Sequence, residues 1–209
     1  NEAHTLVENG AREIILLGQN VNAYSFIEGN KKYNLSSLII ELNNIKKLKR
    51  IRFTTSHPKD MTDDLINCYR DCDKLMPFLH LPIQSGSNRI LKSMNRTYTR
   101  EEFLDLVSII RKYMPDCSIS TDIIVGFPGE TEEDFLETYN FLNELDVSYL
   151  HVFTYSERQN TTAVKMDGVV PKHIRSERSK MLHILSDKKK RFFYNQHLGK
   201  TYNVLFEAE

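Results

Sequence analysis

The feature that most constrains the fold is a repeated alternation of short apolar runs with longer amphipathic segments. Five runs rich in Ile, Val, Phe and Tyr are candidate strands, at 13–17, 50–54, 78–82, 118–125 and 147–155. Their starts lie 28 to 40 residues apart, which is the spacing of successive βα units. This alternation is compatible with an open doubly wound sheet or a (β/α) barrel, and five units of similar size favour the barrel.

The helices between these strands carry their own start signals. Thr99 with Glu102 and Thr131 with Asp134 are capping boxes, in which the two side chains satisfy the first free backbone N–H groups. Further helices are expected over 1–9, 35–45 and 61–69. The chain is therefore predicted to be an α/β protein with parallel connections.

Composition excludes several classes of protein. The chain has 209 residues, 28 basic and 28 acidic, and 40% of its residues are hydrophobic, so it is not intrinsically disordered. It has no apolar run of the roughly 18–20 residues that a membrane span needs, so we expect no membrane association. Three cysteines do not make a disulfide framework, which predicts a reducing, cytoplasmic setting.

Three segments differ in character. Residues 1–170 hold the βα units, 171–199 form one long basic helix, and 200–209 show a strand-like alternation with nothing left to pair with. The nine Lys and Arg residues of 171–200 outnumber the two acidic ones, so the zero net charge is a sum over oppositely charged parts. We interpret the chain as an interior piece of a longer protein, because the opening residues already read as a helix in progress.

Polar residues follow every candidate strand. In parallel βα folds the carboxyl ends of the strands lie at one edge, where the chemistry is found. The residues in question are 18–22, 54–58, 83–87, 121–131 and 154–158. Their amides, hydroxyls and backbone groups converge as a site for a polar small-molecule cofactor requires.

The turn from Gly126 to Gly129 has a further interpretation. It leads into a helix that begins at Thr131, so its free N–H groups could hold an anion or a ring acceptor. The alternative is an ordinary turn with a helix cap. Glu130 stands beside this N-terminus and would repel a phosphate, which disfavours a phosphate site.

A metal-dependent barrel hydrolase is an alternative of another class. His57, His80 and His151 lie on or after strands, but the sequence has no His-x-His or Glu-x-x-His spacing. His80 and His151 are expected to be interior histidines with satisfied hydrogen bonds. Cys68 and Cys72 lie four apart on a helix and are interpreted as ordinary helix residues, so no metal ligand is expected in this chain.

Five motifs in order resemble the radical S-adenosylmethionine methylthiotransferases. They are the Gly-Gln-Asn-Val-Asn-Ala-Tyr of 18–24, the Thr-Thr-Ser-His-Pro-Lys-Asp of 54–60, the His-Leu-Pro-Ile-Gln-Ser-Gly-Ser of 80–87, the Thr-Asp-Ile-Ile-Val-Gly-Phe-Pro-Gly-Glu-Thr of 121–131 and the Tyr-Ser-Glu-Arg of 155–158. The resemblance covers nearly the whole chain with the expected gaps.

The resemblance implies a partial (β/α) barrel of the radical SAM type, here with strands 2–6, followed by the basic helix and the first strand of a TRAM-like β domain. It implies S-adenosylmethionine and two [4Fe-4S] clusters as cofactors, with the cluster cysteines outside this chain. The chain alone is then expected to be inactive. The enzyme would install a methylthio group on an unactivated C–H of its substrate.

The resemblance also implies roles for individual residues. The cofactor would be bound by Gln19, Asn20, Gln84, Ser85, Asp122, Ile124, Gly126, Phe127 and Tyr155. The RNA would be contacted by Arg158, Arg175, Arg178, Lys188, Lys189, Lys190 and Arg191. A basic helix suits phosphate contacts, although a solvated helix face is an equal alternative. A monomer is expected, and the sequence does not identify the electron donor.

The family has several branches. Motifs 84–87 and 155–158 resemble the branches that modify adenosine 37 in the anticodon stem-loop of tRNA, and motifs 18–24 and 54–60 favour the isopentenyladenosine enzyme. Some features of 152–158 also suit the threonylcarbamoyladenosine branch. A catalytically silent RNA-binding relative on the same scaffold remains a further alternative.

Overall fold

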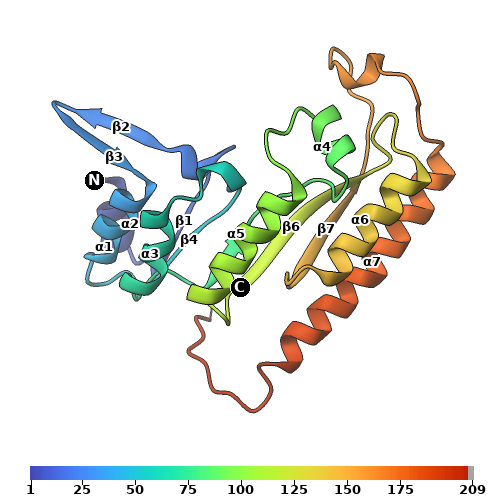
Figure 1. Cartoon of the computed structure of the whole chain (residues 1–209). Helices are drawn as coiled ribbons and strands as arrows, with labels where there is room; N and C mark the ends of the chain where they lie inside the picture. The colour runs from blue at the N-terminus through green and yellow to red at the C-terminus, as the bar shows by residue number, and fades with distance from the viewer. Residues whose placement is uncertain (207–209) are drawn as a thin grey trace.

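The computed structural model describes residues 1–206 and contains a curved array of five parallel strands with helices along one face (Figure 1). The strands are β1 (Glu13–Leu16), β4 (Arg50–Phe53), β5 (Phe78–His80), β6 (Ser118–Val125) and β7 (Tyr149–Thr154). All five were predicted, and the predicted ends differ from the observed ones by two residues at most. The order in space follows the order in the chain, as a barrel sector requires.

The five strands form two hydrogen-bonded sheets, which are joined to each other by fewer hydrogen bonds. β1 pairs with β4, and β5, β6 and β7 pair in a second sheet. The two parts meet where Ile51 of β4 donates its N–H to Lys74 O at 2.7 Å, and where the Ser56 N–H donates to His80 O at 3.2 Å. The strands therefore form one sector whose carboxyl ends lie along a common edge.

The two faces of strand β6 show why the fold is a barrel sector and not a doubly wound sheet. Ile119, Ile123 and Val125 are buried in the core shared with the outer helices. Asp122 and Ile124, on the opposite face, remain partly exposed. A doubly wound sheet would be covered on both faces, whereas a barrel sector keeps an inner face for side chains and ligands.

The outer helices confirm the predicted capping boxes. They are α1 (Glu2–Glu8), α2 (Leu35–Asn43), α3 (Asp63–Asp71), α4 (Asn88–Ser93), α5 (Arg100–Tyr113), α6 (Glu132–Glu144) and α7 (Lys172–Asn195). The capping boxes at Thr99 and Thr131 are both formed. The helix expected over 61–69 begins later than predicted, with Thr62 as its N-cap, because Pro58–Asp60 form a short 3-10 turn.

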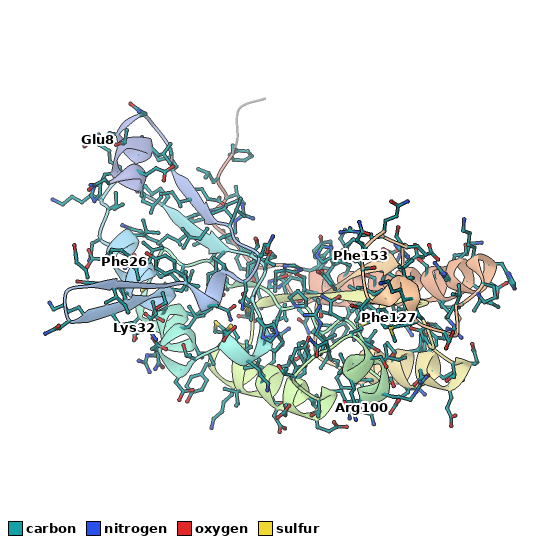
Figure 2. The ribbon with its side chains drawn as sticks, turned by 90° about the horizontal axis from the view of Figure 1, so that it is seen from above. Glu8, Phe26, Lys32, Arg100, Phe127 and Phe153 are labelled. Atoms are coloured by element: carbon teal, nitrogen blue, oxygen red, sulfur yellow. The ribbon has the colours of Figure 1, made fainter. Side chains whose placement is uncertain are left out.

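A β-hairpin that was not predicted follows the first strand. β2 (Ser25–Glu28) and β3 (Lys31–Asn34) pair antiparallel and project from the molecule (Figures 1 and 2). Gly29 has a φ of +59° and precedes Asn30 in the two-residue turn. This Gly-Asn pair is a known hairpin signal, but the flanking strands are too polar to have been recognised as strands.

Helix α7 is more than the connector that was expected. It packs on β7, with Leu182 and Leu185 buried, and the Ser186 Oγ both donates to Leu150 O at 2.9 Å and accepts from Leu150 N at 3.0 Å. This part of α7 is therefore the last covering helix of the array. The division of the chain into segments at 171 and 199 stays a prediction.

The strand expected over 200–209 is absent from residues 200–206, and 207–209 lie outside the described residues. A single strand without a neighbour has no ladder partner, so the alternating pattern alone cannot form one. This segment instead places Asn203 O 2.8 Å from an Arg50 guanidinium nitrogen. The assignment of this segment to a further β domain stays a prediction. No helix within 1–206 is both long and apolar enough to cross a membrane.

Candidate cofactor site

The carboxyl ends of β5, β6 and β7 enclose a cleft of about 530 Å³. Figure 2 shows Phe127 and Phe153 in this part of the molecule, well away from the hairpin that carries Phe26 and Lys32. The lining residues are Gln84, Asp122, Ile124, Phe127, Phe153, Thr154, Tyr155, Ser156, Arg158, Thr161 and Ala163. The cleft thus combines an amide, a carboxylate and three aromatic rings, which suits a polar molecule that contains a ring.

Gln84 enters the cleft from a strained backbone position. Its φ is +77°, in the left-handed region that side chains other than glycine rarely adopt. The conformation is held from both sides, because Gln84 N–H donates to Asp122 O at 2.8 Å and Gln84 O accepts from Ile124 N at 3.0 Å. Strain maintained by its surroundings in this way is a mark of functional sites.

A hydrogen-bonded chain fixes the Asp122 carboxylate. The Thr55 N–H donates to His80 Nδ1 at 3.2 Å, and His80 Nε2 lies 2.7 Å from Asp122 Oδ1. Because Nδ1 is an acceptor, the neutral ring must carry its proton on Nε2 and donate it to the carboxylate. The backbone of Thr55, like that of Gln84, is in the left-handed region, with a φ of +63°.

His151 completes a small polar cluster on the inner face. Its ring stands at right angles to that of His80, with 5.5 Å between the centroids. Burial lowers the pKa of His151, and the nearby Asp122 carboxylate opposes this shift. With His151 neutral, the Asp122 carboxylate supplies the charge of this cluster.

The metal centre of three histidines is not formed. Candidate ligand atoms of His80, Asp122 and His151 lie within 4.8 Å of one another, but His57 is not part of the group. His57 accepts from Lys59 N and makes an edge contact with the Tyr98 ring. His80 also has no free lone pair while Nδ1 accepts and Nε2 donates, which disfavours a cation here. The expectation of an interior histidine with satisfied hydrogen bonds is confirmed for His80. It stays a prediction for His151.

Phe127 and Tyr155 form an aromatic wall of the cleft. Their rings make an edge contact with 5.5 Å between the centroids. The Tyr155 hydroxyl is buried and has no hydrogen-bond partner among residues 1–206. Because this hydroxyl is buried, Tyr155 presents its ring to the cleft.

The turn from Gly126 to Gly129 uses several of its N–H groups within the protein. Gly126 N–H donates to the Glu130 carboxylate at 2.9 Å, and Gly129 N–H donates to Gly168 O at 2.8 Å. The Thr131 N–H donates to Asp134 at 2.9 Å. Because these three N–H groups already have partners, the structure favours the ordinary capped turn over the anion-binding alternative.

Four of the predicted cofactor residues do not line the cleft, namely Gln19, Asn20, Ser85 and Gly126. Ser85 is buried, and its hydroxyl lies 3.2 Å from that of Thr138 on α6. Gln19 is exposed beyond β1, and Asn20 donates to Asp60 Oδ2 at 2.7 Å. Burial against α6 prevents Ser85 from reaching a ligand in the cleft, so this part of the prediction needs correction.

The predicted RNA-contacting residues divide into two groups. Arg175 and Arg178 are each 5% exposed, and their guanidinium groups bind internal acceptors. Lys189 donates to Leu145 O at 2.7 Å at the end of α6, and burial lowers its pKa to about 8. The prediction that Arg175 and Arg178 contact RNA was wrong, because the folded chain uses both side chains internally.

The remaining basic residues are accessible. Lys188 and Arg191 are exposed on α7, and Arg158 is exposed at the cleft. Lys190 is half-buried, with its ammonium group 5.4 Å from the centroid of the Tyr149 ring. Charge alone therefore did not distinguish a solvent-facing cation from an internal one.

The three cysteines do not form a ligand set. Cys68 and Cys117 are buried, and burial raises the pKa of each thiol to about 12. Cys72 is also buried on α3. Within residues 1–206 no three cysteines come together, so the described chain does not provide the donors of an iron–sulfur cluster.

Phe153 is a cleft residue that the sequence analysis missed. It is 52% exposed and follows His151 by two positions on β7. Side chains two apart on a strand share a face, so the placement of Tyr155 already implied that of Phe153. Thr161 and Ala163 come from an irregular segment, for which no comparable signal exists.

Comparison with known families agrees with this architecture. The family model described as the Radical SAM superfamily matches residues 1–142. The chain belongs to the Radical SAM superfamily. The parallel array and its carboxyl-edge cleft are thus the barrel sector of this superfamily.

Curated relatives within the Radical SAM superfamily are close in sequence. The chain is 49% identical over 209 residues to the tRNA-2-methylthio-N(6)-dimethylallyladenosine synthase of Zymomonas mobilis, covering all of this chain and 47% of that protein. It is 47% identical over 207 residues to the synthase of the same name from Acetivibrio thermocellus, covering 99% of this chain and 43% of that protein. The chain therefore spans about half the length of these relatives.

Two solved structures share the fold. Coproporphyrinogen III oxidase of Escherichia coli matches 74% of this chain and 37% of its own, with a TM-score of 0.60 at 17% identity. The archaeal Elp3 of Methanocaldococcus infernus matches 88% of this chain and 48% of its own, with a TM-score of 0.58 at 13% identity. At these identities the likeness supports the fold alone.

The superfamily implies S-adenosylmethionine and a [4Fe-4S] cluster as cofactors. The cleft fits the first of these, since a carboxylate and an amide line it beside aromatic rings. The cysteines of residues 1–206 do not fit the cluster.

Proposed function

We propose that this protein is a tRNA methylthiotransferase, which adds a methylthio group to C2 of N6-isopentenyladenosine at position 37 of the anticodon stem-loop. The observation that carries the proposal is the 49% identity over the whole of this chain to a tRNA-2-methylthio-N(6)-dimethylallyladenosine synthase. The relative from Acetivibrio thermocellus, at 47% identity, supports the same substrate branch.

Five residues of the cleft are proposed to hold S-adenosylmethionine. Gln84 and Asp122 offer an amide and a carboxylate to its amino and hydroxyl groups, and Ile124, Phe127 and Tyr155 pack against its adenine ring. When bound and reduced, the cofactor supplies the radical that activates the substrate C–H. The chain itself binds and orients the cofactor and excludes water from the cleft.

Asp122 has the most clearly defined role in this proposal. Its carboxylate is held by His80, so one oxygen is oriented before any ligand arrives. An oriented acceptor loses less entropy on binding than a freely rotating one. Asp122 is therefore expected to contribute most of the polar affinity of the cleft.

The tRNA is proposed to contact the exposed cations. Arg158 stands at the mouth of the cleft, and Lys188 and Arg191 are exposed on α7. Cations of this kind bind phosphates regardless of base sequence. Lys190, which is half-buried between two tyrosine rings, is proposed as a weaker contact.

The proposal is tested by removing the gene that encodes the full-length protein from its host and analysing tRNA nucleosides by mass spectrometry. The expected result is loss of the 2-methylthio group with accumulation of N6-isopentenyladenosine. Accumulation of N6-threonylcarbamoyladenosine without its methylthio group would assign the other branch instead. Unchanged 2-methylthio nucleosides, in a host with no second copy of the gene, would contradict the proposed activity.

A further inference from the structure

Arg175 binds three acceptors at the base of one long loop. Its Nε donates to Val170 O at 2.8 Å, Nη1 donates to Tyr155 O at 2.8 Å, and Nη2 donates to Glu157 Oε1 at 2.6 Å. The segment 156–170 makes up most of the connection from β7 to α7. Tyr155 directly precedes this segment, Glu157 is near its beginning, and Val170 is its last residue. Arg175 therefore joins the beginning of this segment to its end.

The segment that Arg175 closes forms one side of the cleft. Four of its residues line the cleft, namely Ser156, Arg158, Thr161 and Ala163. Apart from the 3-10 turn Ala163–Lys165 it has no regular structure. One more hydrogen bond, from Gly129 N–H to Gly168 O at 2.8 Å, joins the segment to the turn that follows β6. The position of this wall thus depends on a few hydrogen bonds at its base.

Arg175 also supports the aromatic wall. Its guanidinium carbon lies 5.4 Å from the centroid of the Tyr155 ring, and Tyr155 contacts Phe127. The aliphatic stem of Arg175 passes Gly126 so closely that a Cβ at that position would clash with it. Gly126 thus leaves room for the Arg175 side chain beneath the cleft.

We infer that Arg175 is a positioning residue of the cofactor cleft: it closes segment 156–170 at its base and fixes the Tyr155 ring, so that S-adenosylmethionine meets a preformed site. This inference rests on the proposed function for the identity of the ligand. Only a guanidinium can make all three bonds, because its planar fork presents five donors in fixed directions, whereas a lysine ammonium is a single point.

The experiment uses the full-length protein with its clusters reconstituted, in the absence of tRNA. The variants are Arg175→Lys and, as a control on the exposed face of the same helix, Lys180→Ala. Isothermal titration with S-adenosylmethionine gives the Kd. Trypsin cleavage after Arg158 and Lys165 reports the position of the segment.

The expected result for Arg175→Lys is a Kd raised roughly tenfold, because bonds to a charged donor are lost. Cleavage of the segment should become several-fold faster, and protection should require correspondingly more S-adenosylmethionine. Lys180→Ala should match the parent protein in both measurements. Faster cleavage with an unchanged Kd, or no change in either, would overturn the positioning role.

A second variant covers the case in which Arg175→Lys fails to fold. Glu157→Gln weakens one of the three bonds from a half-exposed side chain and leaves the core intact. It should raise the Kd and the cleavage rate in the same direction by a smaller factor, and equality with the parent in both would overturn the inference. Failure of the proposed function would appear separately, as absence of tRNA methylthiolation by the parent protein.

Discussion

His80 Nε2 donates to Asp122 Oδ1 across 2.7 Å, while the backbone N–H of Thr55 donates to the other nitrogen of the same ring. The segment after β4, the end of β5 and the middle of β6 are thereby linked through one imidazole. The Thr55 backbone N–H can only donate, so His80 Nδ1 is the acceptor of that bond. The proton of the neutral ring is then on Nε2, which donates to Asp122. The carboxylate that faces the cleft is oriented by residues that lie behind it.

Replacing His80 is expected to weaken cofactor binding. His80→Ala removes the donor that orients Asp122, and the Kd for S-adenosylmethionine should rise roughly tenfold, in line with a lost hydrogen bond to a charged group. His183→Ala, at an exposed position of α7, is the matched control and should bind as the parent does. Calorimetry on the full-length protein measures both. An unchanged affinity of His80→Ala would contradict the role given to this hydrogen bond.

The buried ion pair of Arg178 with Glu130 should be essential for stability. Its Nη1 lies 2.6 Å from Glu130 Oε1, and both side chains are almost completely buried. Burial raises the pKa of Glu130, and the Gly126 N–H and Arg178 oppose this shift. Arg178→Met removes the cation and leaves a carboxylate without its partner, which should cost about 3 kcal/mol of unfolding free energy at pH 8.

The cost of Arg178→Met should depend on pH. With the pKa of Glu130 raised in the folded state, protonation stabilises the variant at low pH, and this stability is lost as the pH rises through the folded-state pKa. Urea unfolding should therefore show a smaller deficit at pH 5 than at pH 8. Lys180→Met on the same helix serves as the control and should cost little at either pH. If Arg178→Met lost the same unfolding free energy at pH 5 and pH 8, the unpaired Glu130 carboxylate would not be the cause of the loss.

Asp134 should contribute stability that disappears in acid. Burial by itself would raise the pKa of Asp134, but hydrogen bonds from Arg89, Thr131 and Ser87 outweigh it and lower the pKa well below the ordinary value. Asp134→Asn removes the charge that these donors stabilise. The loss should be about 2 kcal/mol at pH 7.

The pH dependence of Asp134 has the opposite sign to that of Glu130. A lowered folded-state pKa gives stability that is complete above the unfolded value near pH 4 and declines as the pH falls toward the folded value. The difference between parent and Asp134→Asn should be smaller at pH 3 than at pH 7. Asp105→Asn, exposed on α5, is the control. Urea unfolding at pH 3 and pH 7 measures this difference in unfolding free energy. A difference that is the same at both pH values would contradict a stabilising charge on Asp134.

The exposed cations of α7 should account for part of the salt dependence of tRNA binding. Lys188→Ala and Arg191→Ala should each weaken binding and reduce the slope of log K against log salt by about one, as expected for one lost phosphate contact. Lys47→Ala, exposed beyond α2, should leave the slope unchanged. Filter binding over a range of salt concentrations measures the slope. If both α7 variants have the same slope as the parent protein, Lys188 and Arg191 do not contact the tRNA phosphates.

The buried arginines could have been found from the helix pattern. Arg175, Arg178, Leu182, Leu185 and Lys189 follow the alternating spacing of three and four residues that marks one helix face. Two of these are buried leucines, so the arginines on the same stripe must also turn inward. Counting charges along 171–199 concealed this pattern, because the basic residues on the other faces dominated the sum.

Local signals in the sequence were sufficient for the strands, the capping boxes and the alternation that defines the fold. These depend on hydrogen bonds and side-chain periodicity within a few residues, as at Thr99 and Thr131. The edge on which the cofactor residues meet also followed from the parallel topology, and Gln84, Asp122 and Tyr155 do line one cleft.

Only the tertiary structure decided which polar side chains face the cleft and which are used to build it. Ser85 and Gln84 are neighbours in sequence, yet one bonds to Thr138 under α6 and the other lines the cleft. Arg175 and Arg158 carry the same charge, but one is buried among carbonyl oxygens and the other remains exposed. A side chain's partner is set by elements distant in sequence, and the cost of burying an unpaired polar group selects that partner only once those elements are packed.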